Sequence, residues 1–502
     1  MAGEPVFLGV DLGTTSVKAQ AVTASGVVLN EGRATYGHID DGVRFDQDPE
    51  EIWAAFVATV QRIAATLAGR EVGGIGIVGQ SPTMLWLDHS GRPLTRAMGW
   101  RDVRAAGHVE RIAAVMTPGW QKRHLGYDLP ITAGFTPTRL SWYVTEHPAM
   151  VDGARAVVAL KDLAVFRLTG HLTSDPANAR GISHAVTKEL THELLETIGL
   201  DVGKVPGVRD PWERAGVLQP AVATQLGLPA GTPVAVGWGD LFASMLSTAV
   251  LSRADREYDI TGTAEAGGAS TAGHLPAPGL ISLPITADLH ATYGSTQAGG
   301  GSVAWWQERI LLDRGADRLS DAVGERLTAP PSVLFLPHLG GERAPLWNRV
   351  LRGTFLGLDA SHDRVDMSRA VLEGVAFSVR QLIARIEVAR GYPLDSPVMI
   401  AGAAAGNTTW NRIKADILGR SVEICALKEP SAFGAAILAM VAADGASNPF
   451  DVSEQLLTPG QVIDPDPRHS AHYEELFALY DGAEAALASL HAGLERVRGL
   501  PS

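Results

Sequence analysis

The stretch that most constrains the fold is FLGVDLGTTSVKAQAV, which runs from Phe7 to Val22. An apolar segment ends in an acid, Asp11, and small or hydroxyl residues follow it: Gly13, Thr14, Thr15 and Ser16. From Val17 onward apolar and polar side chains alternate, which is the period of a strand. The pattern therefore predicts a β-hairpin with Gly13–Ser16 at its tip. A Walker or Rossmann loop is excluded, because both need a helix directly after the glycines, with its N-terminus facing phosphate.

A tip of this composition can bind phosphate. Its backbone N–H groups and hydroxyls can surround the anion. Asp11 can hold a Mg²⁺ ion, usually through water, and that ion would neutralise the phosphate charge. Lys18, on the second strand, would add a fixed positive charge. The same residue types are also common in ordinary β-turns, so the stretch by itself leaves a purely structural role open.

The chain continues as a mixed α/β pattern. A third strand is expected at residues 27–36, and Asp48–Pro49 begins a helix whose apolar residues keep helical spacing as far as Leu67. The segment GIGIVGQ, Gly74–Gln80, is expected to be a buried strand. The order β-β-β-α-β predicts a mixed sheet with helices on its faces, and hence an α/β fold.

With 502 residues the chain is too long for one ordinary core, so we expect two large domains. The second half repeats the first weakly. Arg256–Gly268 contains a strand with a Gly–Thr tip, and a long helix runs from about Asp366 to Arg390 and ends at Gly391. We place the boundary near Leu246–Asp255 and expect an N-terminal domain at residues 1–248 and a C-terminal domain at residues 249–502.

The composition excludes several classes of protein. A single cysteine, Cys425, excludes a disulfide framework and a multi-cysteine metal site, and it suits a reducing cytoplasm. The formal net charge of −13 argues against a nucleic-acid surface. No apolar run approaches the roughly 18 residues of a membrane span, and Met1–Pro5 does not begin a signal peptide. We therefore expect a cytoplasmic protein that binds neither nucleic acid nor membrane.

Asp240 is the leading candidate for a catalytic group. It follows an apolar strand in TPVAVGWGD, Thr232–Asp240, and precedes a helical stretch, Leu241–Val250. An Asp at that place can simply cap the helix. A helix N-terminus also favours the ionised carboxylate, and a carboxylate at the end of a strand is well placed to accept a proton from a hydroxyl.

Three segments in the second half are rich in small residues, which allow close approach to the backbone. Their candidate residues are Gly262 and Thr263 in the second tip, Gly300 in a three-glycine turn, and Gly402, Ala403 and Asn407 before a helix. Each also has a plainer interpretation, as a turn, a hinge or a helix cap.

Taken in order, these segments resemble the motifs of the FGGY carbohydrate kinases. GVDLGTTSVKA is similar to the family's first phosphate motif, and ITGTAEAGG is similar to its second phosphate motif. GWGDLFAS resembles the segment of the catalytic aspartate, and AGAAAGNTTWNRIKADILG resembles the adenosine motif. Further similar stretches are ALKDLAVFRLTGHLTSDPANARG, GGGSVAWW, GGERAPLWNRVLRGTFLGL and EPSAFGAAILA. The resemblance covers roughly Phe7 to Asp444.

The resemblance implies two actin-like, ribonuclease-H-like domains with a cleft between them, the superfold of sugar kinases, Hsp70 and actin. It implies ATP and Mg²⁺ as cofactors, with Asp240 as the general base. Asp11 and Asp240 would hold the metal. The implied nucleotide-binding residues are Asp11, Gly13, Thr14, Thr15, Ser16, Lys18, Gly262, Thr263, Gly300, Gly402, Ala403 and Asn407. Dimers are common in the family, so a homodimer is also expected.

The sugar pocket is the least determined part. The segment GWRDVRA is similar to a Trp-x-Asp-x-Arg segment of the family's sugar pocket, and the loop GQSPTM follows the strand at residues 74–78. The implied substrate residues are Gln80, Ser81, Trp100, Asp102 and Arg104, together with Asp240. Xylulose kinases tend to place Gln-Met-His in that loop, and the histidine is missing here.

A small sugar is expected as substrate, with a ketopentose such as xylulose as the leading expectation from overall resemblance. The alternatives are a kinase for another polyol, ketose or sugar acid, such as glycerol, ribulose or gluconate. An actin- or Hsp70-like ATPase without a sugar substrate and a non-catalytic sugar-sensing relative also remain open. The sequence leaves undetermined which hydroxyl is phosphorylated and whether the loop GAAAG alters the preference for a nucleotide.

Overall fold

A computed structural model describes residues 4–67, 69–297, 299–312, 316–327 and 333–497. The chain divides into two compact units. Unit 1 comprises Met1–Ser252, Leu283–Thr286 and Glu429–Leu457, and unit 2 comprises Arg253–Ser282, Ala287–Lys428 and Thr458–Ser502. In the described part of the chain, no helix combines the length and the apolar character that crossing a membrane requires.

The central sheet of unit 1 has the strand order β10-β11-β6-β1-β2-β3, and β12 also pairs with β6. Its strands are β1 (Val6–Leu12), β2 (Ser16–Thr23), β3 (Val28–Thr35), β6 (Val72–Gly79), β10 (Arg214–Val217), β11 (Pro233–Ala235) and β12 (Trp238–Gly239). Strands β1 and β2 pair antiparallel, whereas β6 lies parallel to β1. The predicted hairpin, the third strand and the mixed sheet are therefore confirmed.

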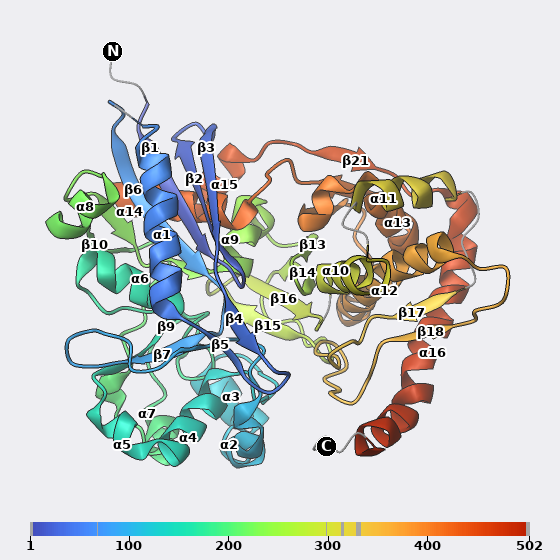
Figure 1. Ribbon diagram of the computed structural model, residues 1–502, viewed down its shortest axis with the longest axis horizontal. Helices are drawn as coiled ribbons and strands as arrows, with labels where there is room; N and C mark the ends of the chain where they lie inside the picture. The colour runs from blue at the N-terminus through green and yellow to red at the C-terminus, as the bar shows by residue number, and fades with distance from the viewer. Residues whose placement is uncertain (1–3, 68, 298, 313–315, 328–332, 498–502) are drawn as a thin grey trace. The chain divides into compact units, whose positions relative to one another are not determined.

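Helices cover both faces of this sheet (Figure 1). Helix α1 (Pro49–Ala64) begins as predicted, with Asp48 accepting a hydrogen bond from the Glu50 amide. The opposite face is covered by α14 (Pro430–Asp444), which lies very close to the strands. A Cβ on Gly9 or Gly76 would come within 1.9 Å of a carbonyl oxygen of α14. Glycine at these two strand positions is what lets the helix backbone approach.

The position of α14 differs from the division expected at residue 248. The first stretch of unit 1 does end close to that point, at Ser252. Residues 429–457 then return to unit 1, more than 170 positions later in the chain. A split at one point in the sequence cannot represent this arrangement, because the helix that completes the first sheet is encoded after most of the second unit.

Unit 1 also contains a second sheet and further helices. The second sheet has the order β4-β5-β8-β7-β9. Its strands are β4 (His38–Asp40), β5 (Phe45–Gln47), β7 (Met84–Leu87), β8 (Ala97–Met98) and β9 (Ala156–Ala159). The helices are α2 (Val109–Val115), α3 (Pro118–His124), α4 (Thr136–Glu146), α5 (Pro148–Gly153), α6 (Leu160–Thr169), α7 (His192–Ile198), α8 (Pro220–Leu226), α9 (Asp240–Ser247) and α15 (Pro449–Leu456).

Unit 2 repeats the central arrangement of unit 1. Its sheet has the order β15-β16-β14-β13-β19-β20-β21, with β13 and β14 antiparallel and β19 parallel to β13. The strands are β13 (Arg256–Thr261), β14 (Glu265–Thr271), β15 (Ile281–Pro284), β16 (His290–Ser295), β19 (Val398–Gly402), β20 (Val422–Ile424) and β21 (Gln461–Ile463). Each unit thus has a hairpin whose first strand pairs with a parallel neighbour, as in the predicted two-domain α/β fold.

Helices and a small separate sheet complete unit 2. The small sheet consists of β17 (Leu334–Leu336) and β18 (Thr354–Leu356), and the helices are α10 (Gly300–Trp305), α11 (Ala316–Glu325), α12 (Arg364–Arg390), α13 (Thr408–Leu418) and α16 (Pro467–Val497). Helix α12 confirms the predicted long helix, and Gly391 ends it with a φ of +90°. Apolar residues of α12, α13 and α16 pack with β19 in one core.

Candidate active site

The first hairpin tip is held by hydrogen bonds at Gly13, whereas the amides of the next two residues are left available. The Gly13 amide donates to the Ser16 carbonyl at 3.1 Å, and the Tyr36 hydroxyl donates to the Gly13 carbonyl. In the part of the chain that the structure describes, the amides of Thr14 and Thr15 donate to no acceptor. Such neighbouring N–H groups at a tight turn form an anion-binding concavity. The tip therefore has the donors that a phosphate needs.

Asp11 is the penultimate residue of β1, close to this tip. Its Oδ2 accepts a hydrogen bond from Ser431 at 2.7 Å, whereas its buried Oδ1 has no partner among the described residues. Burial raises the pKa of Asp11 to about 6, although Lys18 and Ser431 both act to lower it. An unpartnered, buried carboxylate oxygen is costly. Unsatisfied buried groups of this kind are found at sites where a ligand or ion binds.

Lys18 lies opposite Asp11 on β2, as the hairpin predicts. Its Nζ forms an ion pair with Glu429 at 2.5 Å, and Glu429 is the residue that precedes α14. The positive charge expected near phosphate is therefore largely balanced by a residue 411 positions away. The charge of Lys18 still acts to lower the pKa of both Asp11 and Asp240.

Asp240 is the first residue of α9, and Gly239 occupies the capping position. The plainer expectation that Asp240 caps the helix is therefore wrong. Its Oδ1 accepts a hydrogen bond from the neighbouring Leu241 amide, at 2.7 Å. Burial first, and then the charge of Asp11, raise the pKa of Asp240 to about 7. A carboxyl with this pKa can take up a proton near neutral pH, which suits a general base.

The backbone before Asp240 explains how the carboxyl reaches this position. The predicted strand is interrupted at Gly237, which adopts a φ of +81°. A Cβ there would come within 1.9 Å of the Ile77 carbonyl oxygen. After this turn β12 pairs with β6 so that Gly239 lies beside Gly79. Asp240 and Gln80 therefore leave the same end of the sheet.

The two acids fit a Mg²⁺ ion. Within the described residues, no group of three or more His, Cys, Asp or Glu side chains is placed to hold a metal. Mg²⁺ in phosphoryl-transfer sites is usually held by one or two carboxylates together with phosphates and water. The unpartnered Oδ1 of Asp11 and the raised pKa values of Asp11 and Asp240 mark two carboxylates that a cation would stabilise.

A chain of hydrogen bonds joins the expected sugar loop to the first tip. Gln80 donates to Gln47 at 2.6 Å, and Gln47 donates to the Thr14 carbonyl at 2.6 Å. Trp100 donates from Nε1 to the Thr14 hydroxyl at 3.2 Å. The Gln80 Oε1 is buried and has no partner among the described residues. The structure thus brings Gln80 and Trp100 to the phosphate tip and leaves one amide oxygen available as an acceptor.

Ser81 lies beside the start of α9. Its hydroxyl donates to the Ala177 carbonyl at 3.1 Å. Both Ser81 and Ala177 place their Cβ atoms 3.5 Å from where a side chain on Gly239 would begin. Ser81 is therefore close to the backbone that carries Asp240, as a substrate residue would have to be.

Asp102 and Arg104 form an ion pair with each other in this structure. Arg104 contacts the Asp102 carboxylate at 2.7 Å and also pairs with Asp46. The second carboxylate contact of Asp102 is the Phe45 amide, at 2.8 Å, and the residue is only 1 % exposed. The structure therefore shows a buried brace at these two positions, while Trp100 is half-buried beside the tip.

The second hairpin tip lies against the glycine turn. Gly262 and Thr263 are exposed between β13 and β14. The amides of Gly299 and Gly301 both donate to the Thr263 carbonyl at 3.0 Å, and the Gly300 amide donates to the Gly262 carbonyl at 3.1 Å. The structure thus brings Gly300 together with Gly262 and Thr263, and the glycine turn donates to the carbonyls of both tip residues.

The segment expected to contact adenosine begins where β19 ends. Gly402 has a φ of +80°, and a Cβ there would come within 2.2 Å of the Thr261 carbonyl oxygen. Ala403 follows as an exposed residue at the start of a short 3₁₀ turn, Ala403–Gly406. Asn407 then caps α13 by accepting the Trp410 amide at 2.9 Å.

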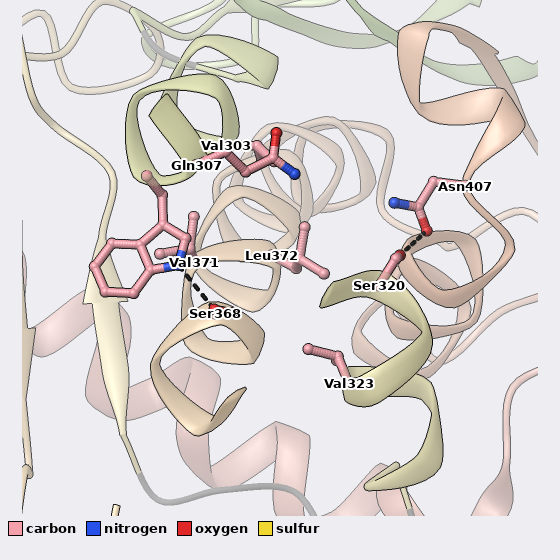
Figure 2. A pocket seen from close by; sticks show the side chains of 9 residues that line it. Val303, Gln307, Ser320, Val323, Ser368, Val371, Leu372 and Asn407 are labelled. Atoms are coloured by element: carbon pink, nitrogen blue, oxygen red, sulfur yellow. Dashed lines mark hydrogen bonds between the residues drawn. The ribbon is translucent and has the colours of Figure 1, made fainter. Parts of the chain in front are cut away.

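Asn407 also lines a small pocket with residues of α11 and α12 (Figure 2). The Ser320 hydroxyl donates to Asn407 Oδ1 at 2.8 Å, so this oxygen serves both the helix and Ser320. The capping role that the sequence left open is therefore present, and among the described residues no acceptor pairs with the amide nitrogen of Asn407.

Comparison with known proteins identifies the family. Residues 6–247 match the N-terminal domain, and residues 260–443 the C-terminal domain, of the FGGY family of carbohydrate kinases. The chain belongs to this family. It is an ATP-using carbohydrate kinase with the two-domain α/β fold.

Relatives of this kinase phosphorylate different substrates. It is 25 % identical to the xylulose kinase of Bacillus subtilis, over 98 % of this chain and 99 % of that protein. It is 24 % identical to the gluconokinase of Bacillus licheniformis, over 96 % of each chain. The solved structure of ligand-bound xylulose kinase from Lactobacillus acidophilus superposes with a TM-score of 0.87 at 22 % identity, covering 98 % of this chain and all of that one.

Several residues that organise the kinase site were not found from sequence. They are Tyr36 and Gln47, which hold the first tip; Glu429 and Ser431, which contact Lys18 and Asp11; and Arg139 of α4. Arg139 is fully buried and donates to the carbonyls of Pro82, Met98 and Gly99 at 2.6–3.2 Å. It thereby ties the Gln80 loop to the Trp100 segment. A lone arginine at helical spacing offers no local signal of this role.

Proposed function

We propose that this kinase transfers the terminal phosphoryl group of ATP to a hydroxyl of a small sugar, with Asp240 as the general base. The observation that carries the proposal is the position of Asp240. It begins α9 at the sheet end that also carries Asp11 and Gln80, and its pKa lies near 7. Phosphoryl transfer needs an oriented nucleophile and charge stabilisation more than covalent chemistry by the protein.

In this proposal Asp240 accepts the proton of the attacking hydroxyl as the new bond to phosphorus forms. Ser81 and the free Oε1 of Gln80 orient the sugar by hydrogen bonds, and Trp100 offers a flat face to its C–H side. Asp102 and Arg104 keep the Trp100 segment in place through their ion pair. Each of these groups lies in unit 1.

The phosphates are proposed to bind to the amides of the two hairpin tips. Thr14 and Thr15 supply donors in unit 1, and Thr263 with its neighbour Ala264 supplies them in unit 2. Asp11 and Asp240 would hold Mg²⁺, which, when bound, neutralises charge on the phosphates. Gly300, Gly402, Ala403 and Asn407 are proposed to contact the remainder of the nucleotide, because the structure gathers them around the second tip and α13.

A ketopentose such as xylulose is the proposed substrate, supported by the overall likeness to xylulose kinases. Gluconate is the second candidate, because gluconokinases match the chain at nearly the same identity. We propose a cytoplasmic enzyme, in keeping with its single cysteine, and a homodimer, from its resemblance to the family.

A coupled assay of ADP release over a panel of ketopentoses, ketohexoses, polyols and aldonic acids tests the proposal. We expect one ketopentose to give the highest kcat/KM and Asp240→Asn to abolish turnover of that sugar. If a sugar acid is the best substrate, gluconate replaces the ketopentose as the proposed substrate. Sugar-independent ATP hydrolysis as the only activity would overturn it.

A further inference from the structure

A buried lysine lies between two buried acids beneath the second tip. Lys414 of α13 donates from Nζ to Asp259 at 2.5 Å and to Glu265 at 2.6 Å. All three side chains are completely buried. Nζ is also 4.6 Å from the ring centre of Trp410, so an aromatic face covers part of the ammonium group. Fully buried charges of this kind persist only when they are closely paired.

The cluster is joined directly to the tip residues. Thr261, the last residue of β13, accepts a hydrogen bond from Lys414 at 3.0 Å and donates to Glu265 at 2.6 Å. Thr261 and Glu265 flank the tip on either side and face each other in the hairpin. Lys414 therefore reaches both ends of the loop that carries Gly262 and Thr263.

The same cluster also lies against the backbone of the glycine turn at Gly299 and of the adenosine segment at Gly402. A Cβ on Gly299 would come within 2.4 Å of Glu265 Oε2, and one on Gly402 within 2.2 Å of the Thr261 carbonyl oxygen. Gly299 and Gly402 therefore pack directly against the cluster.

We propose that Lys414 is a positioning residue for phosphate binding: by holding Asp259, Thr261 and Glu265 in a cluster without net charge, it keeps the second tip able to accept an anion. The proposal rests on the nucleotide role of this tip given above. In the described part of the chain, the amides of Thr263 and Ala264 donate to no acceptor, so both are available to a phosphate.

Charge balance explains why the lysine matters. Burial and the charge of Asp259 raise the pKa of Glu265 to about 8, so at neutral pH Glu265 keeps its proton. Lys414 then balances Asp259 alone. If the lysine is removed, or Glu265 loses its proton, one negative charge remains behind the tip, where the low dielectric makes its repulsion of a phosphate strong. Glu257, the other acid of β13, pairs separately with Arg390 and Arg420.

Calorimetric titration of the full-length protein with ADP and with adenosine tests the proposal. We expect Lys414→Met to weaken ADP binding about tenfold, the effect of one unit charge about 12 Å away at an effective dielectric of about 20. Adenosine, which has no phosphate, should bind the variant and the wild type equally. Arg390→Met is the matched control, because it removes a cation from a buried carboxylate on the same strand, at the end away from the tip. Its ADP affinity should stay within about twofold.

The pH profile gives a second measurement that a merely structural role would not change. The affinity of the wild type for ADP should fall as the pH rises through about 8, whereas Glu265→Gln should keep its neutral-pH affinity and lose this fall. The double variant Lys414→Met/Glu265→Gln should bind ADP more weakly than Glu265→Gln, because Asp259 is left unbalanced.

The outcomes separate the inference from the proposed function. A wild-type protein that binds no ADP would overturn the nucleotide role of the tip itself. Wild-type binding with equal ADP affinity in Lys414→Met, or equal losses for ADP and adenosine, would overturn only the positioning role. If Lys414→Met does not fold, an unchanged pH profile in Glu265→Gln still refutes the proposal.

Discussion

At the scale of single residues, the site is built from groups that are unfavourable for the protein alone. Asp11 is a buried acid and Asp240 a half-buried one, both with raised pKa values, and one oxygen of Asp11 has no partner among the described residues. Such perturbed carboxyls concentrate at functional sites because ligands, rather than the fold, satisfy them. Two predictions follow from Asp240, one for activity and one for stability.

Asp240→Asn should nearly abolish sugar phosphorylation. The amide has almost the same size, and its oxygen can still accept the Leu241 amide, so the fold should survive. It cannot accept the proton of the attacking hydroxyl, and general-base catalysis contributes about 10²–10⁴-fold. The loss should appear in kcat rather than in KM. Wild-type turnover by a variant with wild-type melting would show that the base lies elsewhere.

The same substitution should stabilise the protein free of ligands. A carboxyl whose pKa is raised from 3.8 to about 7 adds its full stability below pH 4 and loses it as the pH rises through 7. Asp240→Asn has no such loss. Melting curves without ATP or metal should therefore coincide near pH 4, and the variant should melt a few degrees higher at pH 8. A variant that is less stable at pH 8 would contradict the raised pKa.

At the scale of elements, α14 can pack closely on the central sheet because two strand positions that face it are glycine. Gly9 and Gly76 face carbonyl oxygens of Ala432 and Ala435, so the helix lies closer to the sheet than any side chain allows. This approach also brings Glu429 and Ser431, at the start of the helix, to Lys18 and Asp11. The packing of one helix thus sets the surroundings of Asp11.

Gly76→Ala should test this contact. The new Cβ would lie 1.9 Å from the Ala435 carbonyl oxygen, so the helix must move, at an expected cost of about 1–3 kcal/mol in the free energy of unfolding. Gly482→Ala on α16 is the control, because its Cβ meets nothing within 4 Å and alanine favours the helix. Chemical denaturation should show the first variant destabilised and the second slightly stabilised. Equal stability of the two would mean that α14 does not pack as described.

At the scale of the whole molecule, unit 1 is discontinuous in sequence. The segment Glu429–Leu457 covers one face of a sheet whose strands all come from the first 252 residues. A fragment that ends at Ser252 would expose that apolar face, including the glycines against which α14 rests. Large exposed apolar surfaces of this kind lead to aggregation.

Fragment 4–252 should therefore fail to fold cooperatively, whereas the same fragment linked to residues 429–457 should fold. Near-ultraviolet circular dichroism and denaturant titration would measure this, with a scrambled 429–457 segment of the same composition as the control. Cooperative unfolding of fragment 4–252 alone would show that α14 is dispensable for unit 1.

The sequence by itself determined the local elements and the candidate residues. Both hairpin tips, the capped start of α1 and the end of α12 at Gly391 follow from spacing and turn chemistry, which act within a few residues. The junction that carries Asp240 was located in the same way, although the sequence left open a capping role that Gly239 holds instead.

Only the tertiary structure decided which distant residues meet at these elements. Glu429 pairs with Lys18, Ser431 bonds to Asp11, and Lys414 reaches Thr261 and Glu265 across more than 140 positions. No local pattern specifies such partners, because a buried charge is satisfied by whichever group the packing of helices on sheets brings near it. The residues of the two hairpin tips could therefore be identified from the chain, while the charged groups around them depend on how α13 and α14 pack.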